Sequence, residues 1–227
     1  MRISPVVALL PLIVLPAVAA DAPGAATTSE VRMLDCQGPF ATDASEASLK
    51  QAFGAENVEY KTVPGAEGVE TQATVIYPND PARMVTVFWW DEAARTKPAT
   101  IQVQADYAAD PDGSNYWKTD VLWQSTQGVK IGSSAAEVEA LNGKPFKMSG
   151  FGWDYGGFAV GWEGGKLDTP EGSACSLSVR FSSSVETPPD GAMGDTELMS
   201  NSPEMLGAKP RVTEFSIGYP MEDTPSR

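Results

Sequence analysis

The stretch SSAAEVEALNGKPFKMSGFGWDYGGFAVGWEGGKL, residues 133–167, begins with helix signals and continues with densely spaced glycines and aromatics. Ser134 and Glu137 have the spacing of a capping box, in which each residue satisfies a backbone N–H of the other. Gly143 suits the left-handed position that follows a helix. The stretch therefore predicts a short helix over 133–143, followed by strands.

The glycine-rich part of this stretch predicts strands and tight turns. In FAVGW, large apolar side chains alternate with small ones at period two, as in a strand; these are Phe158, Val160 and Trp162. Trp153 and Tyr155 are expected to share a face in the same way. Glycine pairs at 156–157 and 164–165 suit turns with positive φ, so we expect two hairpins that present an aromatic face.

The same glycines do not match a phosphate-binding loop. GFGWDYG has the spacing G-x-G-x-x-x-G, which differs from the dinucleotide fingerprint, and it does not open a predicted helix. GGKL lacks the serine or threonine that follows lysine in a P-loop. We therefore predict no nucleotide cofactor and no other cofactor.

The first half of the chain shows the same order of signals. TDASEASLKQAFG, residues 42–54, predicts a helix capped by Thr42 or Asp43. Strand-like runs separated by turn chemistry follow each helix; they cover 57–63, 70–77, 83–90 and 99–105 in the first half, and end with 211–219 in the second. The sequence thus predicts an α+β fold of two repeats, each a short helix followed by about four antiparallel strands.

The predicted organisation assigns every part of the chain. The first repeat covers 33–110, a link 111–127, and the second repeat 128–219. A segment rich in Pro, Gly, Ser and acids, 182–210, is expected to be a long insertion, a surface loop with one helical turn in DTELM. A tail, 220–227, closes the chain.

The N-terminus predicts export. Residues 1–20 combine Arg2, a short proline-broken apolar run and small residues at the end, as in a signal peptide cleaved after Ala19 or Ala20. Residues 21–32 are expected to be a flexible lead. No other run is apolar and long enough to cross a bilayer, so we expect a periplasmic or secreted protein that is not membrane-spanning.

The chain has two cysteines, Cys36 and Cys175. Because an exported protein meets oxidising surroundings, a disulfide between them is predicted. A buried free thiol plus an unpaired one is the alternative.

Charge and residue types exclude several functions. The chain has 30 acidic and 16 basic residues and no histidine. Its negative charge disfavours nucleic acid and favours a cationic partner, although acidity also serves solubility. Without histidine, Ser-His-Asp catalysis and the histidine-bearing zinc motifs are excluded. DPDGSN, residues 110–115, has oxygen ligands, but Val121 occupies the calcium loop's glutamate position, so we assign no metal site and no catalytic residue.

Aromatic residues supply the candidate binding face. We assign to it six side chains: Trp89, Trp90, Trp153, Tyr155, Phe158 and Trp162. They pack in the core, or form a platform for a partner protein or a glycan. Adjacent Trp89 and Trp90 must point to opposite faces of a strand.

The segment GVKIGSSAAEVEALNGKPF, residues 128–146, matches G-x-x-x-x-E-V-x-x-x-x-G-x-P, and SEASLKQAFG at 45–54 matches it loosely. A capped helix with four strands, present twice, resembles the tandem modules of the beta-lactamase inhibitor protein. One such unit resembles the outer-membrane assembly lipoprotein BamE, and the aromatic strand resembles those of uncharacterised exported bacterial proteins. The resemblance covers residues 36–219 and implies fold more than function. Asp35 occupies the position where a lipid-anchor motif needs a small residue, so no lipid anchor is expected at Cys36. No inhibitory residue of the beta-lactamase inhibitor protein can be assigned to a position of this sequence.

We therefore expect a non-enzymatic protein that binds another protein or an envelope component, with an oligomeric state that the sequence does not determine. One alternative is a lysozyme inhibitor, because SGFGWDYGGFAVGW is similar to the Ser-Gly/Tyr loop of periplasmic inhibitors. The other is an enzyme that acts on envelope glycans with two carboxylates. Three acidic residues beside aromatics are candidates for it: Asp91, Asp154 and Glu163.

Overall fold

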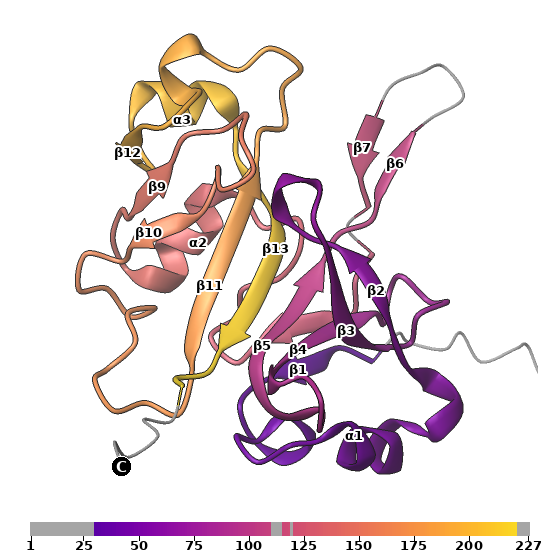
Figure 1. The fold of residues 1–227 in the computed structure, drawn as a ribbon. Coiled ribbons are helices and arrows are strands. Elements are labelled where there is room, and N and C mark those ends of the chain that lie inside the picture. The colour runs from indigo at the N-terminus through magenta and orange to yellow at the C-terminus, as the bar shows by residue number, and fades with distance from the viewer. Residues whose placement is uncertain (1–29, 110–114, 119, 222–227) are drawn as a thin grey trace, which may run out of the picture.

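The computed structural model, which describes residues 30–109, 115–118 and 120–221, contains a six-stranded antiparallel sheet (Figure 1). Its strand order is β11-β13-β5-β4-β3-β2. The strands are β2 (Val58–Pro64), β3 (Glu70–Ile76), β4 (Val85–Asp91), β5 (Thr96–Gln104), β11 (Ser176–Ser182) and β13 (Arg211–Gly218). The α+β class with antiparallel sheets is confirmed.

Smaller elements surround this sheet. Three short strands form a second antiparallel sheet in the order β10-β9-β12, with β9 (Lys147–Ser149), β10 (Ala159–Gly161) and β12 (Glu197–Met199). β1 (Arg32–Leu34) pairs in parallel with β8 (Trp123–Ser125), and β6 (Tyr107–Ala109) pairs with β7 (Asn115–Trp117). The helices are α1 (Glu46–Phe53), α2 (Ala135–Asn142) and α3 (Pro203–Ala208), with 3-10 turns at Gly38–Phe40, Ala55–Asn57, Ala66–Gly68 and Asp190–Ala192.

The two predicted helices form, and one has a different cap. Ser134 and Glu137 make the predicted capping box of α2, and Gly143 follows it with a φ of 83°. In α1 the cap is Ser45, whose side chain accepts from the Ser48 N–H, so the prediction of Thr42 or Asp43 is wrong. The chain between those residues and α1 is held extended because Ser45 pairs with β5.

A single core lies on one face of the large sheet. Along its central strands, buried apolar residues alternate with partly exposed ones, as strand geometry requires. Each helix contributes a fully buried residue to this core: Leu49 from α1, Val138 from α2 and Met205 from α3. Figure 1 shows α1 at the lower end beside β2–β5 and α3 at the upper end beside β9 and β12.

The interpretation as two repeats is not confirmed. After α1, the strands β2, β3, β4 and β5 follow one another as a continuous antiparallel meander. After α2, β9 and β10 belong to the small sheet, and only β11 and β13 join the large one. Phe158, the residue before β10, forms an isolated bridge with Arg180 of β11. The strands that follow α2 therefore do not form a continuous meander like the one that follows α1.

The segment 182–210 is not a surface loop throughout, because a 3-10 turn, a strand and a helix form between residues 190 and 208. The predicted helical turn in DTELM is wrong, because Glu197–Met199 forms β12 and pairs with β9. A helix that was not predicted, α3, follows it. Its residues Met205 and Ala208 are fully buried, so this segment completes the core at the upper end of the molecule.

The second predicted hairpin, at glycines 164–165, is also wrong. Residues 163–168 form turns and no strand. The buried Asn142 side chain at the end of α2 accepts from the Leu167 N–H and donates to the Trp162 carbonyl oxygen. These bonds fold the chain back onto α2 and bury Leu167, which prevents a strand from forming there.

Several predicted segments fall wholly or partly outside the described residues. The signal peptide, residues 1–20, lies outside them, as does the predicted lead up to residue 29 and the tail from 222 onward. The predicted link, 111–127, includes β7 and β8 in its described part. Within the described residues, the helices are all too short or too polar to cross a membrane.

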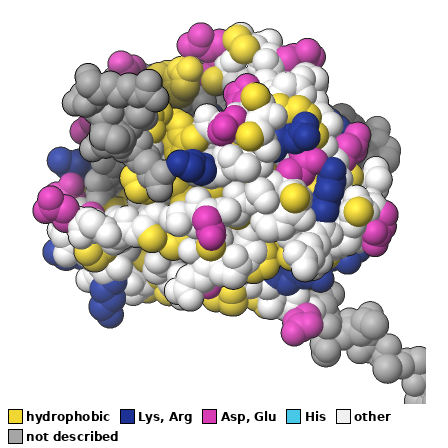
Figure 2. Space-filling view, turned by 60° about the horizontal axis from the view of Figure 1, so that its bottom comes forward, with side chains coloured by type: hydrophobic (Ala, Val, Ile, Leu, Met, Phe, Trp, Pro, Cys, Tyr) yellow, Lys and Arg dark blue, Asp and Glu magenta, His cyan; other side chains and the backbone are white. Residues whose placement is uncertain are grey.

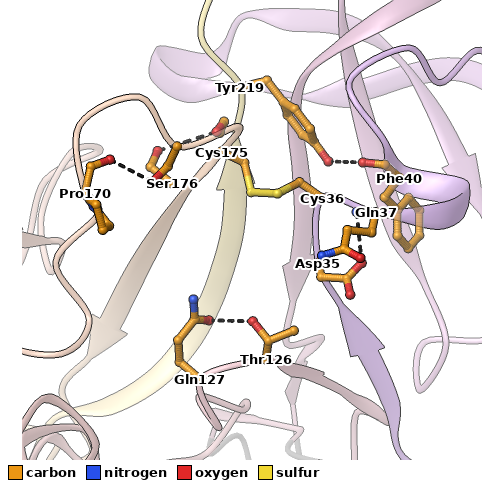
Figure 3. The surroundings of a disulfide bond; sticks show 12 residues. Asp35, Cys36, Gln37, Phe40, Thr126, Gln127, Pro170, Cys175, Ser176 and Tyr219 are labelled. Carbon is orange, nitrogen blue, oxygen red and sulfur yellow. Dashed lines mark hydrogen bonds between the residues drawn. A yellow bond between two sulfur atoms is a disulfide. The ribbon is translucent and has the colours of Figure 1, made fainter.

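The predicted disulfide is present (Figure 3). Cys36 and Cys175 have Cα atoms 6.2 Å apart and join parts of the chain 139 residues apart. Beside it, the buried Tyr219 hydroxyl donates to the Phe40 carbonyl oxygen. Burial, and secondarily the negative charge of Asp35, raise the pKa of Tyr219, so its hydroxyl remains protonated even at a pH where an exposed tyrosine ionises. The disulfide and this hydrogen bond join Cys175, just before β11, and Tyr219, just after β13, to the N-terminal segment.

We expect the double variant Cys36→Ser/Cys175→Ser to lower the free energy of unfolding by up to about 5 kcal/mol, because the bond closes a very long loop in the unfolded chain. Urea denaturation monitored by circular dichroism measures the change, and wild-type protein treated with a reductant should match the variant. A loss below about 1 kcal/mol would show that the cross-link constrains the unfolded chain far less than loop-closure entropy predicts.

Candidate functional site

The sheet face opposite the core, here called the open face, carries polar side chains. It presents the residues that alternate with the buried ones: Thr86, Phe88, Gln102, Gln104, Arg180 and Glu214. Strand register places some of them in rows across the sheet. Glu214 of β13 lies between Arg180 of β11 and Gln104 of β5, and Gln102 pairs with Thr86 of β4.

A groove of about 680 Å³ lies over this face. Its floor comes from the open face, including Thr86, Gln102 and Glu214. One wall is the end of β2 and the turn after it, residues 61–66, and the other includes Trp153 and Asp154. The groove thus combines residues from both halves of the chain, which meet where β5 pairs with β13.

Hydrogen bonds fix the wall formed by residues 151–157, here called the aromatic loop. The Arg180 guanidinium donates from Nη2 to the Asp154 carbonyl oxygen at 2.7 Å and from Nε to the Gly156 carbonyl oxygen at 2.9 Å. Across the groove, the Glu67 N–H donates to Asp154 Oδ2 at 2.8 Å. The aromatic loop is therefore held to the sheet on one side and to the β2–β3 turn on the other.

Trp153 and Tyr155 present exposed aromatic surface on this loop. Their side chains are exposed at 39% and 50%, and their rings meet edge to face with centroids 5.8 Å apart. Trp153 Nε1 donates to the Gly150 carbonyl oxygen at 3.2 Å, so the polar atom of the indole has a partner. What remains available to a ligand is the apolar ring surface, held in one orientation.

The glycines of the aromatic loop allow close approach of the chain. A Cβ at Gly157, whose φ is +81°, would lie 2.0 Å from the Phe181 carbonyl oxygen of β11. A Cβ at Gly156 would lie 2.6 Å from the Gly150 carbonyl oxygen and 2.9 Å from the Trp153 ring. Only glycine fits at these positions, so the two glycines serve to pack the loop on the sheet edge.

The structure separates the six predicted binding residues. Trp153 lines the groove and Tyr155 packs against its ring, and Phe158, half-buried, lies beneath the Arg180 guanidinium at 5.0 Å. Trp89 and Trp162 are only 4% and 9% exposed, so they belong to the core. The expected shared face of Phe158, Val160 and Trp162 is wrong, because the register shifts within β10 and leaves Val160 exposed and Trp162 buried.

Trp90 lies in a different place. As predicted, it points away from its buried neighbour Trp89 and is 43% exposed. It lines a separate hollow of about 530 Å³ with Lys97, Tyr219 and Met221, near the end of β13. Figure 2 brings this end of the molecule forward and shows hydrophobic side chains in a hollowed part of the surface. A single aromatic face that contains all six residues does not exist.

Most of the groove lining was not predicted, including the polar side chains of its floor, Gln102, Gln104, Arg180 and Glu214. A signal for them exists in the strand runs IQVQ (101–104), SVRF (178–181) and EFSI (214–217), where polar residues alternate with apolar ones. Such alternation marks a second, solvent-facing side of a strand. It does not identify which strands are neighbours, so their convergence was not visible in the sequence.

The electrostatics of the groove centre on Glu214. Burial raises the pKa of its carboxyl group, and the positive charge of Arg180 and a hydrogen bond with Gln102 oppose this only in part. A carboxylate held in a desolvated position is a common feature of binding and active sites. The groove lining contains four charged side chains in all, the cations Lys61 and Arg180 and the anions Asp154 and Glu214.

Among the described residues, no group of acidic or cysteine side chains is arranged to hold a metal ion. Residues 110–114 of the DPDGSN segment lie outside the described residues. Of the acidic candidates for glycan chemistry, only Asp154 lines the groove. Asp91 accepts from the Ala94 N–H in its own turn, and Glu163 pairs with Lys147 at 3.5 Å.

Comparison of the chain with family models, curated proteins and solved structures finds no match in any of the three. The resemblance to BamE and to the beta-lactamase inhibitor protein therefore stays a prediction.

We expect Gly157→Ala to destabilise the protein more than Gly164→Ala. Both residues have positive φ, +81° and +68°, which costs about 1–2 kcal/mol for a residue with a Cβ. A Cβ at Gly164 meets open space, whereas one at Gly157 collides with β11. Thermal and urea unfolding of the two variants compare the costs. Equal costs would show that the loop does not depend on close contact with β11.

Glu214→Gln should stabilise the protein at neutral pH. Because the pKa of Glu214 is raised in the folded state, ionisation above that pKa favours unfolding, and the substitution removes this penalty. The gain should shrink as the pH falls through the folded pKa and disappear below the unfolded value of about 4.3, where both states are protonated. Melting temperatures from pH 4 to 8 test this, with the exposed Glu59→Gln as control. A gain that is independent of pH would contradict it.

Proposed function

We propose that the protein is a non-enzymatic binding protein of the bacterial envelope or extracellular space, and that its ligand lies in the groove on the open face. The observation that carries this proposal is the groove itself, built where β5 and β13 join the two halves of the chain. Its volume of about 680 Å³ is in the range of ligand-binding pockets.

Hydrogen bonds hold the groove walls in place, so a ligand can bind without a large rearrangement of the walls. Arg180 and the contact from Glu67 to Asp154 hold the aromatic loop in place. Trp153 therefore presents its ring surface at the groove before a ligand arrives. Such preorganisation lowers the entropic cost of binding.

Export supports the same proposal. The disulfide between Cys36 and Cys175 fits an oxidising compartment. The signal expected in residues 1–20 would deliver the chain there. In that compartment, the available ligands include cell-wall glycans, peptides and other exported proteins.

An enzyme that cleaves envelope glycans is the second candidate, because Asp154 and Glu214 line the same groove. Glycoside hydrolysis uses two carboxyl groups, and a raised pKa suits the proton donor. One observation disfavours the enzyme: the Asp154 carboxylate already accepts a hydrogen bond from the Glu67 N–H and so has a structural role in the groove wall. The lysozyme-inhibitor alternative lacks such support, because Ser149 is buried and accepts the Phe158 N–H within its own hairpin.

A groove-blocking variant tests the proposal. Immobilised protein is equilibrated with a digest of bacterial envelopes that contains glycan fragments and peptides, and retained species are identified by mass spectrometry. Thr86→Trp fills the floor of the groove, and we expect it to lose species that the wild type retains. Thr100→Trp, on the same sheet face but outside the groove lining, is the matched control and should retain them.

Two outcomes would contradict the proposal. Identical retention by the wild type and Thr86→Trp would show that the groove is not the binding site. Shortening of glycan fragments by the wild type, lost in Glu214→Gln, would instead establish the enzyme. Circular dichroism verifies that each variant is folded.

A further inference from the structure

We propose that the ligand of the groove is a neutral oligosaccharide, an inference that rests on the proposed function and specifies its ligand class. The groove offers a floor of planar polar side chains and an aromatic ring at its wall. Oligosaccharides require both features, because each sugar ring presents hydroxyl groups at its edge and C–H groups on its face.

The charge of the groove differs from that of the whole protein. The chain carries a net charge of −14, which by itself favours a cationic partner. The groove lining holds two cations, Lys61 and Arg180, and two anions, Asp154 and Glu214. These formal charges balance, so the lining itself favours neither a cationic peptide nor an anionic polymer. A neutral polar ligand is the best electrostatic match.

The floor provides donors and acceptors in the combinations that hydroxyl groups need. Gln102 Nε2 donates to Gln104 Oε1 at 3.4 Å, and Gln102 also bonds to Glu214, so part of the hydrogen-bonding capacity is used within the floor. An amide has two N–H donors and an acceptor oxygen, and a carboxylate has two acceptor oxygens, so these side chains keep further capacity for a ligand, and Thr86 offers a hydroxyl group. The register aligns Gln104 with Glu214 and Gln102 with Thr86 on neighbouring strands, about 4.8 Å apart. This spacing allows one hydroxyl-bearing ring to contact two strands at once.

The main chain of the floor favours side-chain recognition. β4, β5 and β13 each pair with a neighbouring strand on both sides, so their backbone N–H and C=O groups are occupied in the sheet. A peptide that binds by strand addition needs free backbone groups at a sheet edge, which the face of the sheet does not offer. Recognition in the groove therefore depends on amide, carboxyl and hydroxyl side chains.

Trp153 completes the site. Its indole N–H is bonded to Gly150, and its ring is supported by Tyr155, so an apolar surface stands beside a polar floor. Stacking of a sugar's C–H face on this surface would place the sugar's hydroxyl edge towards Gln102 and Glu214. A protein partner would instead call for a larger desolvated aromatic cluster, whereas the remaining predicted aromatics are buried or lie elsewhere.

Isothermal titration calorimetry with defined tetramers tests the ligand class. The neutral probes are chitotetraose, cellotetraose and maltotetraose, and the charged probes are tetralysine and tetragalacturonate. We expect at least one neutral probe to bind and both charged probes to bind more weakly. Trp153→Ala should weaken the neutral probe about tenfold or more through loss of stacking. Gln102→Ala should weaken it to a similar degree, and Trp90→Ala, in the separate hollow, should leave binding unchanged.

The outcomes separate this inference from the proposed function. Binding of charged tetramers alone, or of peptides from the envelope digest in a manner blocked by Thr86→Trp, would overturn the saccharide while the groove remains the site. Neutral-probe binding that neither Thr86→Trp nor Trp153→Ala weakens would overturn the inference, because the sugar would then bind elsewhere. If the wild type and Thr86→Trp also retain the same species from the envelope digest, both proposals are contradicted.

Discussion

The pairing of β5 with β13 is the contact on which the rest of the structure depends. It joins the meander that follows α1 to the strands that follow α2, from Thr100–Gly218 to Gln104–Glu214. Because side chains alternate along paired strands, one register decides both faces at once. It places Val103 and Phe215 in the core and Gln104 and Glu214 on the open face. A slip of one residue would bury the polar groups of the groove and expose the core.

The aromatic loop depends on this sheet in turn. It packs on the edge strand β11 because glycines 156 and 157 leave space for backbone contacts. Arg180, which points from β11 on the open face, bonds to the loop through two carbonyl oxygens and also lies over the Phe158 ring. The groove wall is thus an extension of the sheet, and its orientation follows from the position of one guanidinium group. The partly buried carboxyl group of Glu214 lies beside Arg180 in the sheet, and its desolvation raises its pKa.

Much of the local structure could be predicted because it depends on neighbouring residues. The capping box of α2, the turn glycine after it and the strands of the first half arise from short-range hydrogen bonds and alternation. Within the candidate site, Trp153 and Tyr155 were identified from their aromatic character alone. Arg180 and Glu214 could not be, since each is one polar residue in an ordinary strand. The prediction of a surface loop with a helical turn in DTELM was wrong for a similar reason. Residues 197–199 form the strand β12 through pairing with β9, which is distant in the sequence.

The sequence by itself determined the α+β class, the one possible pairing of the two cysteines, the opposite orientations of Trp89 and Trp90 and the exclusion of histidine chemistry. Those properties follow from composition, from short periods and from the presence of only two thiols. Tertiary structure alone decided which aromatic residues are buried and which face the groove, and that the glycines pack a loop against a strand. The physical reason is that burial depends on contacts between strands far apart in the chain, whereas periodicity specifies only that a strand has two faces.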